Sequence, residues 1–305
     1  ITLVIMICSI FLGTSTVRLQ AEDTNNVQEL ELDDNNAYNN MEIPLTSGPS
    51  IIFNYDMEET EASRPSIILH YDMKETEASG ADIIVKDVSG NDITFHGTFK
   101  NTHNGSLMKD ENVGYVSFDG GAANSNSGYI EIPKGSDGSD VLENVNGGVT
   151  VSTLVNWEDD GVNRWIFGLG RVSNDIEYGN GYFFITPRHG KDNGDLISSG
   201  ISHAGWRNEA LIQGASTLTA NKWKLVTSVL DEEKDVISLY VDGVKVASGS
   251  IGGRKLDSII DYEASFSGFL SKSIFQNDPY CKEKIADFRI YNGPLTDEEV
   301  LALYT

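Results

Sequence analysis

The sequence VISLYVDGVKVASGS, residues 236–250, predicts two short antiparallel strands joined at Asp242 and Gly243. An Asp-Gly pair suits a type I′ turn, because both central residues of that turn need positive φ and these two residue types tolerate it. The turn fixes the register, which puts Val241 opposite Val244 and Leu239 opposite Val246. Alternation then predicts one apolar face that packs on a core, made of Ile237, Leu239, Val241, Val244 and Val246.

The chain from about residue 67 onward continues this pattern. Short apolar segments alternate with Gly, Asn, Asp and Ser turns. Besides the hairpin, the segments that we expect to be strands are 67–73, 93–99, 115–118, 128–132, 149–157, 164–169, 182–186, 196–202, 210–213, 223–231, 262–269 and 284–291. Strands spaced in this way predict an all-β protein, a large antiparallel β-sandwich.

The last residues, TDEEVLALY at 296–304, are the one segment with helical periodicity. Thr296 and Glu299 have the spacing of a capping box, and Val300, Leu301 and Tyr304 would form the apolar side. We therefore expect a short C-terminal helix that covers an edge or an end of a sheet.

The composition is acidic. The 305 residues include 22 Lys and Arg and 46 Asp and Glu, a formal net charge of −24, and 39% are hydrophobic, which is enough for a core. A surplus of negative charge disfavours phosphate backbones and anionic membrane surfaces. We expect no nucleic-acid partner and, once a signal segment is removed, no membrane partner.

Residues 1–21 are predicted to be a signal peptide. The apolar run ITLVIMICSIFLG at 1–13 is short for a membrane span, and Ala21 offers a cleavage position, with an uncleaved anchor as the alternative. Cys8 lies in this segment, so Cys281 would be the single mature cysteine and no intramolecular disulfide could form. We expect a secreted protein, extracellular or at a cell surface, and export without disulfides suits a bacterial one.

Residues 22–65 are predicted to be an acidic, disordered linker, because they hold runs such as DDNNAYNN at 33–40 and no hydrophobic periodicity. The segment SIIFNYDMEETEAS at 50–63 is nearly repeated as SIILHYDMKETEAS at 66–79. A local duplication is the simplest explanation. The alternative is that either copy supplies the first strand of the domain at 66–305, which leaves a spare strand for another molecule.

Several segments match one family in the same order. They include KDVSGND at 86–92, YVSFDG at 115–120, GVTVSTLVNWEDD at 148–160, LYVDGVKVAS at 239–248 and NDPYCKEKIADFRIYNGPLTDEEV at 277–300. Over about residues 67–305 the chain resembles the laminin G-like, concanavalin A-like lectin and glucanase domains that accompany bacterial glycoside hydrolases. The resemblance implies a jelly-roll sandwich and a non-catalytic domain that binds a polysaccharide or another glycan. The alternative is an adhesion or structural module that binds a cell-surface protein.

The same resemblance implies a structural calcium ion where the opening loops meet the terminal strand. On the matching segments its ligands would be Asp72, Asp87, Asn91, Asp119 and Asp287. Calcium binds oxygen atoms of carboxylates, amides and backbone carbonyls, which loop Asp and Asn residues supply. The residue before Asp287 is Ala286, where the family often has an acidic residue. The alternative is that these side chains cap turns or face water.

A sugar site needs an aromatic platform beside hydrogen-bonding groups. Trp157, Trp165 and Trp223 lie in strand patterns, so we expect them in the core. Trp206 lies in the loop sequence SHAGWRNEA at 202–210. The predicted carbohydrate site is therefore Trp206 with Arg207, Asn208 and His203, joined by Arg188 from the end of YFFITPRHG at 182–190. His189 follows Arg188 in this segment and could line the same surface.

No catalytic residue is predicted. The E-x-D-x-x-E spacing that retaining glucanases of this superfamily use is absent from the sequence, as are H-x-H and H-x-x-x-H spacings for zinc. A glycan-active enzyme remains the alternative if two carboxylates face one cleft at catalytic separation.

Overall fold

The computed structural model describes residues 64–74, 76–79, 82–101, 107–109, 114–143, 145, 147–159, 161–171, 181–190, 194–259 and 266–305, and four strands before them. The chain divides into two compact units, Ile1–Arg64 and Pro65–Thr305. In the first unit β1 (Thr2–Leu3) pairs with β4 (Ile43–Pro44), and β2 (Val17–Asp23) pairs with β3 (Asn26–Leu32). Apart from Arg64 and Pro65, the other residues of the predicted signal peptide and linker, including the repeat copy at 50–63, lie outside the described residues.

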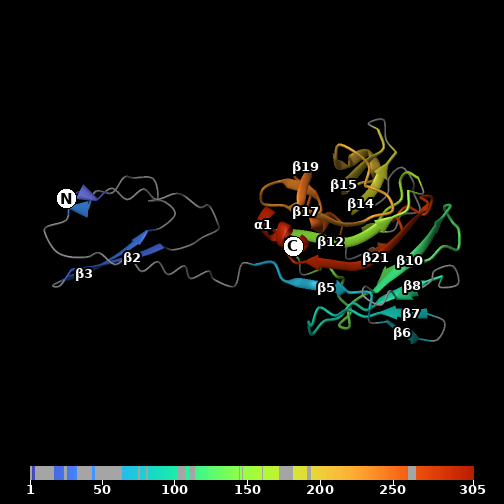
Figure 1. The fold of residues 1–305 in the computed structure, drawn as a ribbon, viewed down its shortest axis with the longest axis horizontal. Helices are drawn as coiled ribbons and strands as arrows, with labels where there is room; N and C mark the ends of the chain where they lie inside the picture. Colours follow the sequence, from blue (N-terminus) through green and yellow to red (C-terminus); the bar gives the residue numbers. More distant parts are fainter. Residues whose placement is uncertain are drawn as a thin grey trace. The chain divides into compact units, whose positions relative to one another are not determined.

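The regular secondary structure of the second unit is almost entirely antiparallel strand, joined by loops (Figure 1). They are β5 (Ile67–Tyr71), β6 (Thr76–Ser79), β7 (Asp82–Val85), β8 (Gly97–Lys100), β9 (Leu107–Lys109), β10 (Gly114–Gly121), β11 (Tyr129–Ile132), β12 (Gly148–Trp157), β13 (Phe167–Arg171), β14 (Tyr182–His189), β15 (Leu196–Ser202), β16 (Ala210–Gln213), β17 (Trp223–Asp231), β18 (Val236–Val241), β19 (Val244–Ser250), β20 (Phe266–Leu270) and β21 (Tyr280–Tyr291). The helices are the short 3-10 turns η2 (Trp206–Asn208) and η3 (Leu256–Ser258), and α1 (Asp297–Tyr304).

These strands form two sheets. One has the order β19-β18-β17-β12-β21-β10-β9, with β5 pairing beside β10 along the same side of β21. The other has the order β16-β15-β14-β13-β20-β11-β8-β7-β6. The predicted all-β sandwich is confirmed. Strands β6, β7 and β9 were not expected, because they are only three or four residues long and carry little alternation.

The main core draws side chains from both sheets. Val151 on β12 and Phe288 on β21 come from one sheet, while Leu169 on β13 and Phe183 on β14 come from the other, and all four are fully buried. Burial of this many apolar side chains stabilises the sandwich by roughly 1.5–3 kcal/mol for each large one. The non-local pairing of β5 with β21 ties the start of the unit to its end.

The hairpin at residues 236–250 forms as predicted, except for the register of its second strand. Asp242 and Gly243 have φ of 52° and 75°, as a type I′ turn needs. Val241 pairs with Val244, but a bulge beyond Tyr240 puts Ala247, not Val246, opposite Leu239. A bulge inserts one residue and therefore reverses the alternation. Ala247 packs toward the core, while Val244 and Val246 are 62% and 37% exposed on the edge strand β19.

Helix α1 begins at the predicted capping box. The backbone N–H of Glu299 donates to Thr296 Oγ1 at 3.2 Å, and the Thr296 N–H donates to Glu299 Oε2 at 2.8 Å. The helix packs Val300 into a small cluster with Val229 and Tyr240 on the outer face of the sheet, and it lies beside the turn at Gly243, at one end of the sheet. Leu301 and Tyr304, predicted on the apolar side, are 47% and 54% exposed.

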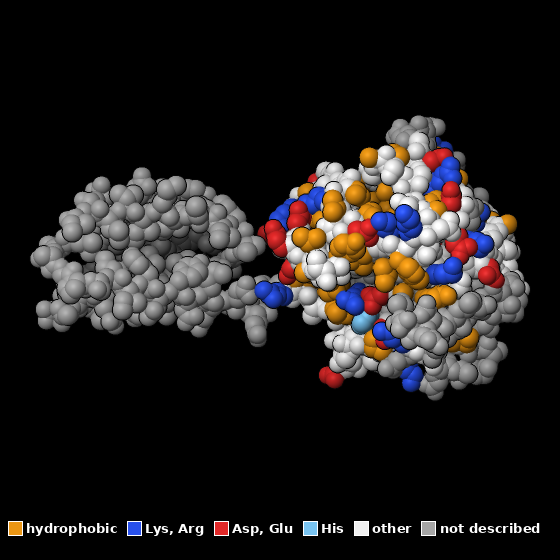
Figure 2. Space-filling view, in the orientation of Figure 1, with side chains coloured by type: hydrophobic (Ala, Val, Ile, Leu, Met, Phe, Trp, Pro, Cys, Tyr) orange, Lys and Arg blue, Asp and Glu red, His pale blue; other side chains and the backbone are white. Residues whose placement is uncertain are grey.

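The acidic surplus does not appear as a continuous acidic face in the view of the second unit in Figure 2, where basic, acidic and hydrophobic side chains lie side by side. Many of the charges are paired, as Lys282 and Lys284 are with Glu158, at 3.1 and 2.9 Å. No helix in the part of the chain that the structure describes has the length and hydropathy needed to cross a bilayer.

Candidate functional site

The outer face of the second sheet carries an aromatic layer. Along β14, Phe183 and Ile185 point into the main core, whereas Tyr182 and Phe184 belong to a separate cluster on the other side. Trp165 stacks on Phe184 with ring centroids 4.3 Å apart and planes 17° apart. The continuous apolar run of β14 is therefore explained by burial of both faces of the strand.

Gly168 makes room for this layer. It lies on β13 beneath the indole of Trp165, and a Cβ added there would come 2.7 Å from a ring carbon of Trp165. Trp165 precedes β13 in sequence and folds back over it. The edge of Phe275, from the loop after β20, meets the same indole with centroids 5.8 Å apart. Three separate segments thus build one aromatic surface.

A cavity of about 260 Å³ opens beside this layer. Its lining combines aromatic rings, amide and imidazole groups and two carboxylates. The described residues that line it are Asn163, Trp165, His189, Gly190, Trp206, Glu209, Phe275 and Asp278. A concave, mostly apolar site with a few convergent polar groups is the usual form of a small-ligand site.

The loop that carries Trp206 is held by local hydrogen bonds. Ser202 Oγ donates to the carbonyl oxygen of Gly205 at 2.6 Å and accepts from the Ala204 N–H at 3.2 Å. Arg254 Nε donates to the carbonyl oxygen of Asn208 at 2.8 Å, at the end of η2. The Trp206 side chain stays 37% exposed at the cavity, so its ring is available to a ligand from solvent.

The two carboxylates of the cavity have different surroundings. Glu209 accepts a hydrogen bond from the hydroxyl of Tyr182, and burial, followed by the nearby Glu209, raises the pKa of that hydroxyl well above its usual value. Tyr182 therefore stays a donor. Asp278 accepts from Ser273 Oγ at 2.8 Å, but burial outweighs this bond and raises the pKa of Asp278 to about 6.

The predicted carbohydrate residues are only partly brought together. Trp206 lines the cavity, and the Arg207 guanidinium lies over the Trp206 ring, 4.5 Å from its centroid. His203 is exposed and does not line the cavity. The Asn208 amide donates to the carbonyl oxygen of Ala204 at 3.1 Å. Arg188 forms ion pairs with Asp159 and Asp195, at 3.0 and 2.8 Å, and does not line the cavity either.

The core predictions for the tryptophans also need one correction. Trp157 is fully buried in the main core, and Trp165 is buried in the outer aromatic layer. Trp223 is 38% exposed at the first position of β17, where its ring lies beside the Tyr115 ring with centroids 5.8 Å apart.

His189, suggested from the sequence, does line the cavity, but sequence reasoning missed the cavity residues that come from the other loops. Asn163, Phe275 and Asp278 lie far from Trp206 in sequence and have no motif in common. One usable signal was present: the run YFFI at 182–185 has no polar alternation, so both of its faces must be covered. That signal locates a covering layer but does not say which loops form it.

The five predicted calcium ligands do not form one oxygen cluster. Asp87 uses Oδ1 to accept from the backbone N–H groups of His70 and Ser89 and Oδ2 to accept from that of Phe95, each at 3.0 Å. Asp72 accepts from the Lys74 N–H at 2.9 Å. Asp87 and Asp72 therefore act as turn caps.

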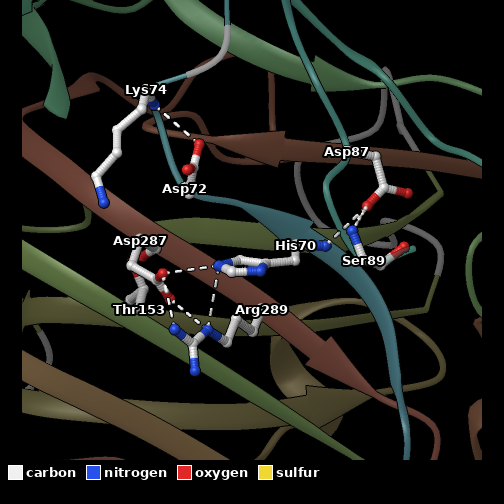
Figure 3. A network of polar contacts seen from close by, with 8 residues as sticks. All are labelled: His70, Asp72, Lys74, Asp87, Ser89, Thr153, Asp287 and Arg289. Atoms are coloured by element: carbon white, nitrogen blue, oxygen red, sulfur yellow. Dashed lines mark hydrogen bonds and ion pairs between the residues drawn. The ribbon is translucent and has the colours of Figure 1, made fainter. Parts of the chain in front are cut away.

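Each of the other three predicted calcium ligands either has another partner within the protein or lies exposed on a strand. The Asn91 amide donates to the carbonyl oxygen of Ile67 at 2.8 Å, and Asp119 is exposed on β10 opposite Lys282 in the register. Asp287 Oδ1 lies 2.8 Å from Arg289 Nε, and Asp287 Oδ2 lies 2.8 Å from His70 Nε2 (Figure 3).

The guanidinium of Arg289 thus supplies the positive charge beside Asp287. Among the residues that the structure describes, no group of three or more His, Cys, Asp or Glu side chains is arranged to hold a metal ion. Ala286 is the extra residue of a bulge, since Leu154 pairs with Asp287 and Val155 with Ile285. The residues present do not fit a calcium ion at this place, and calcium binding stays an untested prediction.

Comparisons with known proteins agree with the architecture. The fourth domain of AbnA, a GH43 extracellular arabinanase from Geobacillus stearothermophilus solved with arabinotriose, is 20% identical, with 79% of this chain and 99% of that chain covered and a TM-score of 0.50. The binding domain of botulinum neurotoxin DC in complex with SialylT is 13% identical, with 78% and 50% covered and a TM-score of 0.50. The binding domain of botulinum neurotoxin serotype D/C VPI 5993 is also 13% identical, with 78% and 51% covered and a TM-score of 0.52.

At these identities the likeness shows the fold alone. The chain spans about half the length of the neurotoxin structures. No curated protein matches the sequence. A laminin G-type family model described as "Concanavalin A-like lectin/glucanases superfamily" matches residues 124–301, more than half of the chain. The chain therefore belongs to the concanavalin A-like lectin/glucanase superfamily.

Proposed function

We propose that this protein is a non-catalytic glycan-binding domain whose site is the cavity beside Trp206. The observation that carries the proposal is the combination of an exposed indole with a cavity lined by two further aromatic rings, an amide and two carboxylates. Sugar rings have apolar faces edged with hydroxyl groups, so they stack on aromatic rings and donate to carboxylate and amide oxygens.

The size of the cavity limits the ligand. A volume of about 260 Å³ is slightly below the range of roughly 300–1,000 Å³ for sites that enclose drug-sized molecules. The site therefore suits one ring at a chain end, or a ring and part of its neighbour, with the rest of the glycan outside. The arabinotriose of the arabinanase domain and the SialylT ligand of the neurotoxin domain support a glycan as the ligand class for this fold.

The test is a glycan array with the full chain, followed by titration of each hit against two variants. Trp206→Ala removes the exposed platform and should reduce binding by about tenfold or more, since stacked aromatic contacts contribute strongly to such sites. Trp223→Ala is the matched control, because Trp223 has almost the same exposure, 38% against 37%, and does not line the cavity. An absence of binding to every glycan, or equal losses in both variants, would refute the assignment.

A second candidate, glycan hydrolysis, is favoured by one observation. Glu209 and Asp278 line the same cavity, and Asp278, with a pKa of about 6, could act as a general acid. The binding proposal expects no release of reducing ends from a bound glycan during prolonged incubation. Release that disappears in both Glu209→Gln and Asp278→Asn would replace the binding proposal with an enzymatic one.

Export is part of the proposal and rests on the apolar run at residues 1–13. A protein partner in place of the glycan is the other alternative, and the array distinguishes the two. An absence of binding to plant, host and bacterial polysaccharides on the array would favour the protein partner.

A further inference from the structure

We infer that the cavity prefers a glycan with a free amino group, such as a glucosamine oligomer, over its neutral or acidic counterparts. This inference rests on the proposed function and adds the chemical class of the ligand.

The first argument is the charge of the lining. Among the described residues that line the cavity, Glu209 and Asp278 carry acidic groups, His189 carries an imidazole, and none is Lys or Arg. An ammonium group entering the cavity would meet carboxylates, whereas a sialic acid or uronic acid would meet charges of its own sign. The net charge of −24 acts in the same direction by attracting cationic ligands.

The second argument is the surroundings of Asp278. One of its oxygens accepts from Ser273 Oγ at 2.8 Å, and Ser273 Oγ in turn accepts from the Phe275 N–H at 3.0 Å. This chain of bonds holds the carboxyl group in place at the cavity. Burial disfavours its ionised form, so an incoming cation relieves an existing electrostatic penalty rather than creating a new one.

The third argument is the aromatic lining. Trp165, Trp206 and Phe275 line the cavity, and the faces of aromatic rings attract cations within about 6 Å of the centroid. The guanidinium of Arg207 already covers one face of the Trp206 ring, 4.5 Å from its centroid, so an amino sugar would use the other face of this ring or the other two rings. An amino sugar can use both kinds of contact, because its ring stacks while its ammonium group pairs with a carboxylate.

The test compares glucosamine oligomers with N-acetylglucosamine oligomers of the same length, using the full chain and titration calorimetry at pH 6.5, where Asp278 is mostly ionised and much of the amine is still protonated. The amino form should bind about tenfold or more tightly, as expected for hydrogen bonds to a charged group. The preference should weaken at higher salt and should be reduced by Asp278→Asn. Glu298→Gln removes one exposed carboxylate from α1, away from the cavity, and should leave the preference unchanged.

The remaining outcomes of this experiment show whether the amino-group preference fails alone or together with the proposed glycan binding. Equal binding of the two oligomers, or tighter binding of the acetylated or a sialylated form, overturns the amino-group preference and leaves glycan binding intact. An amino preference that persists in Asp278→Asn and Glu209→Gln overturns the assignment to this cavity. No binding of any glycan overturns both.

Discussion

Replacing Asp278 by Asn should stabilise the protein above neutral pH. Burial raises the pKa of Asp278 from the ordinary 3.8 to about 6. For an acid, a raised pKa in the folded state means that ionisation is harder when folded than when unfolded. The contribution of Asp278 to stability is therefore most favourable at low pH and falls as pH rises from about 4 to 6, and its full penalty remains above pH 6.

The size of the effect follows from the shift. A difference of about two pKa units corresponds to about 3 kcal/mol, since one unit is 1.36 kcal/mol. Asn cannot ionise, and its side-chain oxygen can still accept from Ser273 Oγ. We expect Asp278→Asn to gain up to about 3 kcal/mol in the free energy of unfolding at pH 8 and only about 1 kcal/mol at pH 4.5.

The measurement is urea unfolding followed by tryptophan fluorescence at pH 4.5, 6 and 8. Glu298→Gln serves as the control for loss of one negative charge and should show no comparable trend, because Glu298 is exposed. A variant that is less stable than the parent at pH 8, or that differs from it equally at all three pH values, would refute the reasoning. A stabilising change that also weakens ligand binding would indicate that the buried carboxyl group serves binding rather than folding.

Four further predictions concern the rest of the fold. Gly168→Ala should destabilise by about 1–3 kcal/mol and weaken glycan binding, because its Cβ would come 2.7 Å from the Trp165 ring; an unchanged unfolding curve and affinity would contradict this. Thr296→Ala should cost about 1 kcal/mol by removing the cap of α1, measured in the same urea assay. EDTA and calcium should leave Tm unchanged, because Asp87 and Asp287 are already engaged; a calcium-dependent rise would restore the predicted ion. Deleting residues 1–63 should change Tm by less than about 2 °C, because the buried Leu69 of the sandwich comes from the second repeat copy; chromatography of both chains at rising concentration checks whether the first copy promotes association.

The opening hairpin illustrates how far sequence reasoning reaches. An Asp-Gly pair between alternating apolar residues predicts the turn, because the steric limits on φ act on two residues alone. Segments with clear alternation and turn signals, such as Leu196–Ser202, Ala210–Gln213 and Trp223–Asp231, also form the expected strands. The bulge beyond Tyr240 was not predicted, since it depends on how β19 meets its neighbour and not on a residue type.

The candidate site, like the hairpin, was predicted only in part from the sequence. Trp206 was predicted at the site because its loop composition differs from that of a strand. Arg188 was predicted beside it and instead pairs with Asp159 and Asp195, which are 29 and 7 residues away in sequence. Similarly, Asp287 matched a calcium ligand in type, but Arg289 and His70 are its actual partners. A residue type indicates what a side chain can bind, but it does not indicate which partner lies within bonding distance in the folded protein.

The all-β class, the hairpin turn, the capped terminal helix and the exposed character of Trp206 could all be predicted from the sequence. These follow from local preferences for φ, from alternation and from capping, which act within a few residues. The convergence of the loops around residues 163, 189, 206 and 275 on one cavity, and the burial of Asp278 there with a raised pKa, are visible only in the folded chain. Burial and desolvation depend on segments distant in sequence, so no local pattern records them.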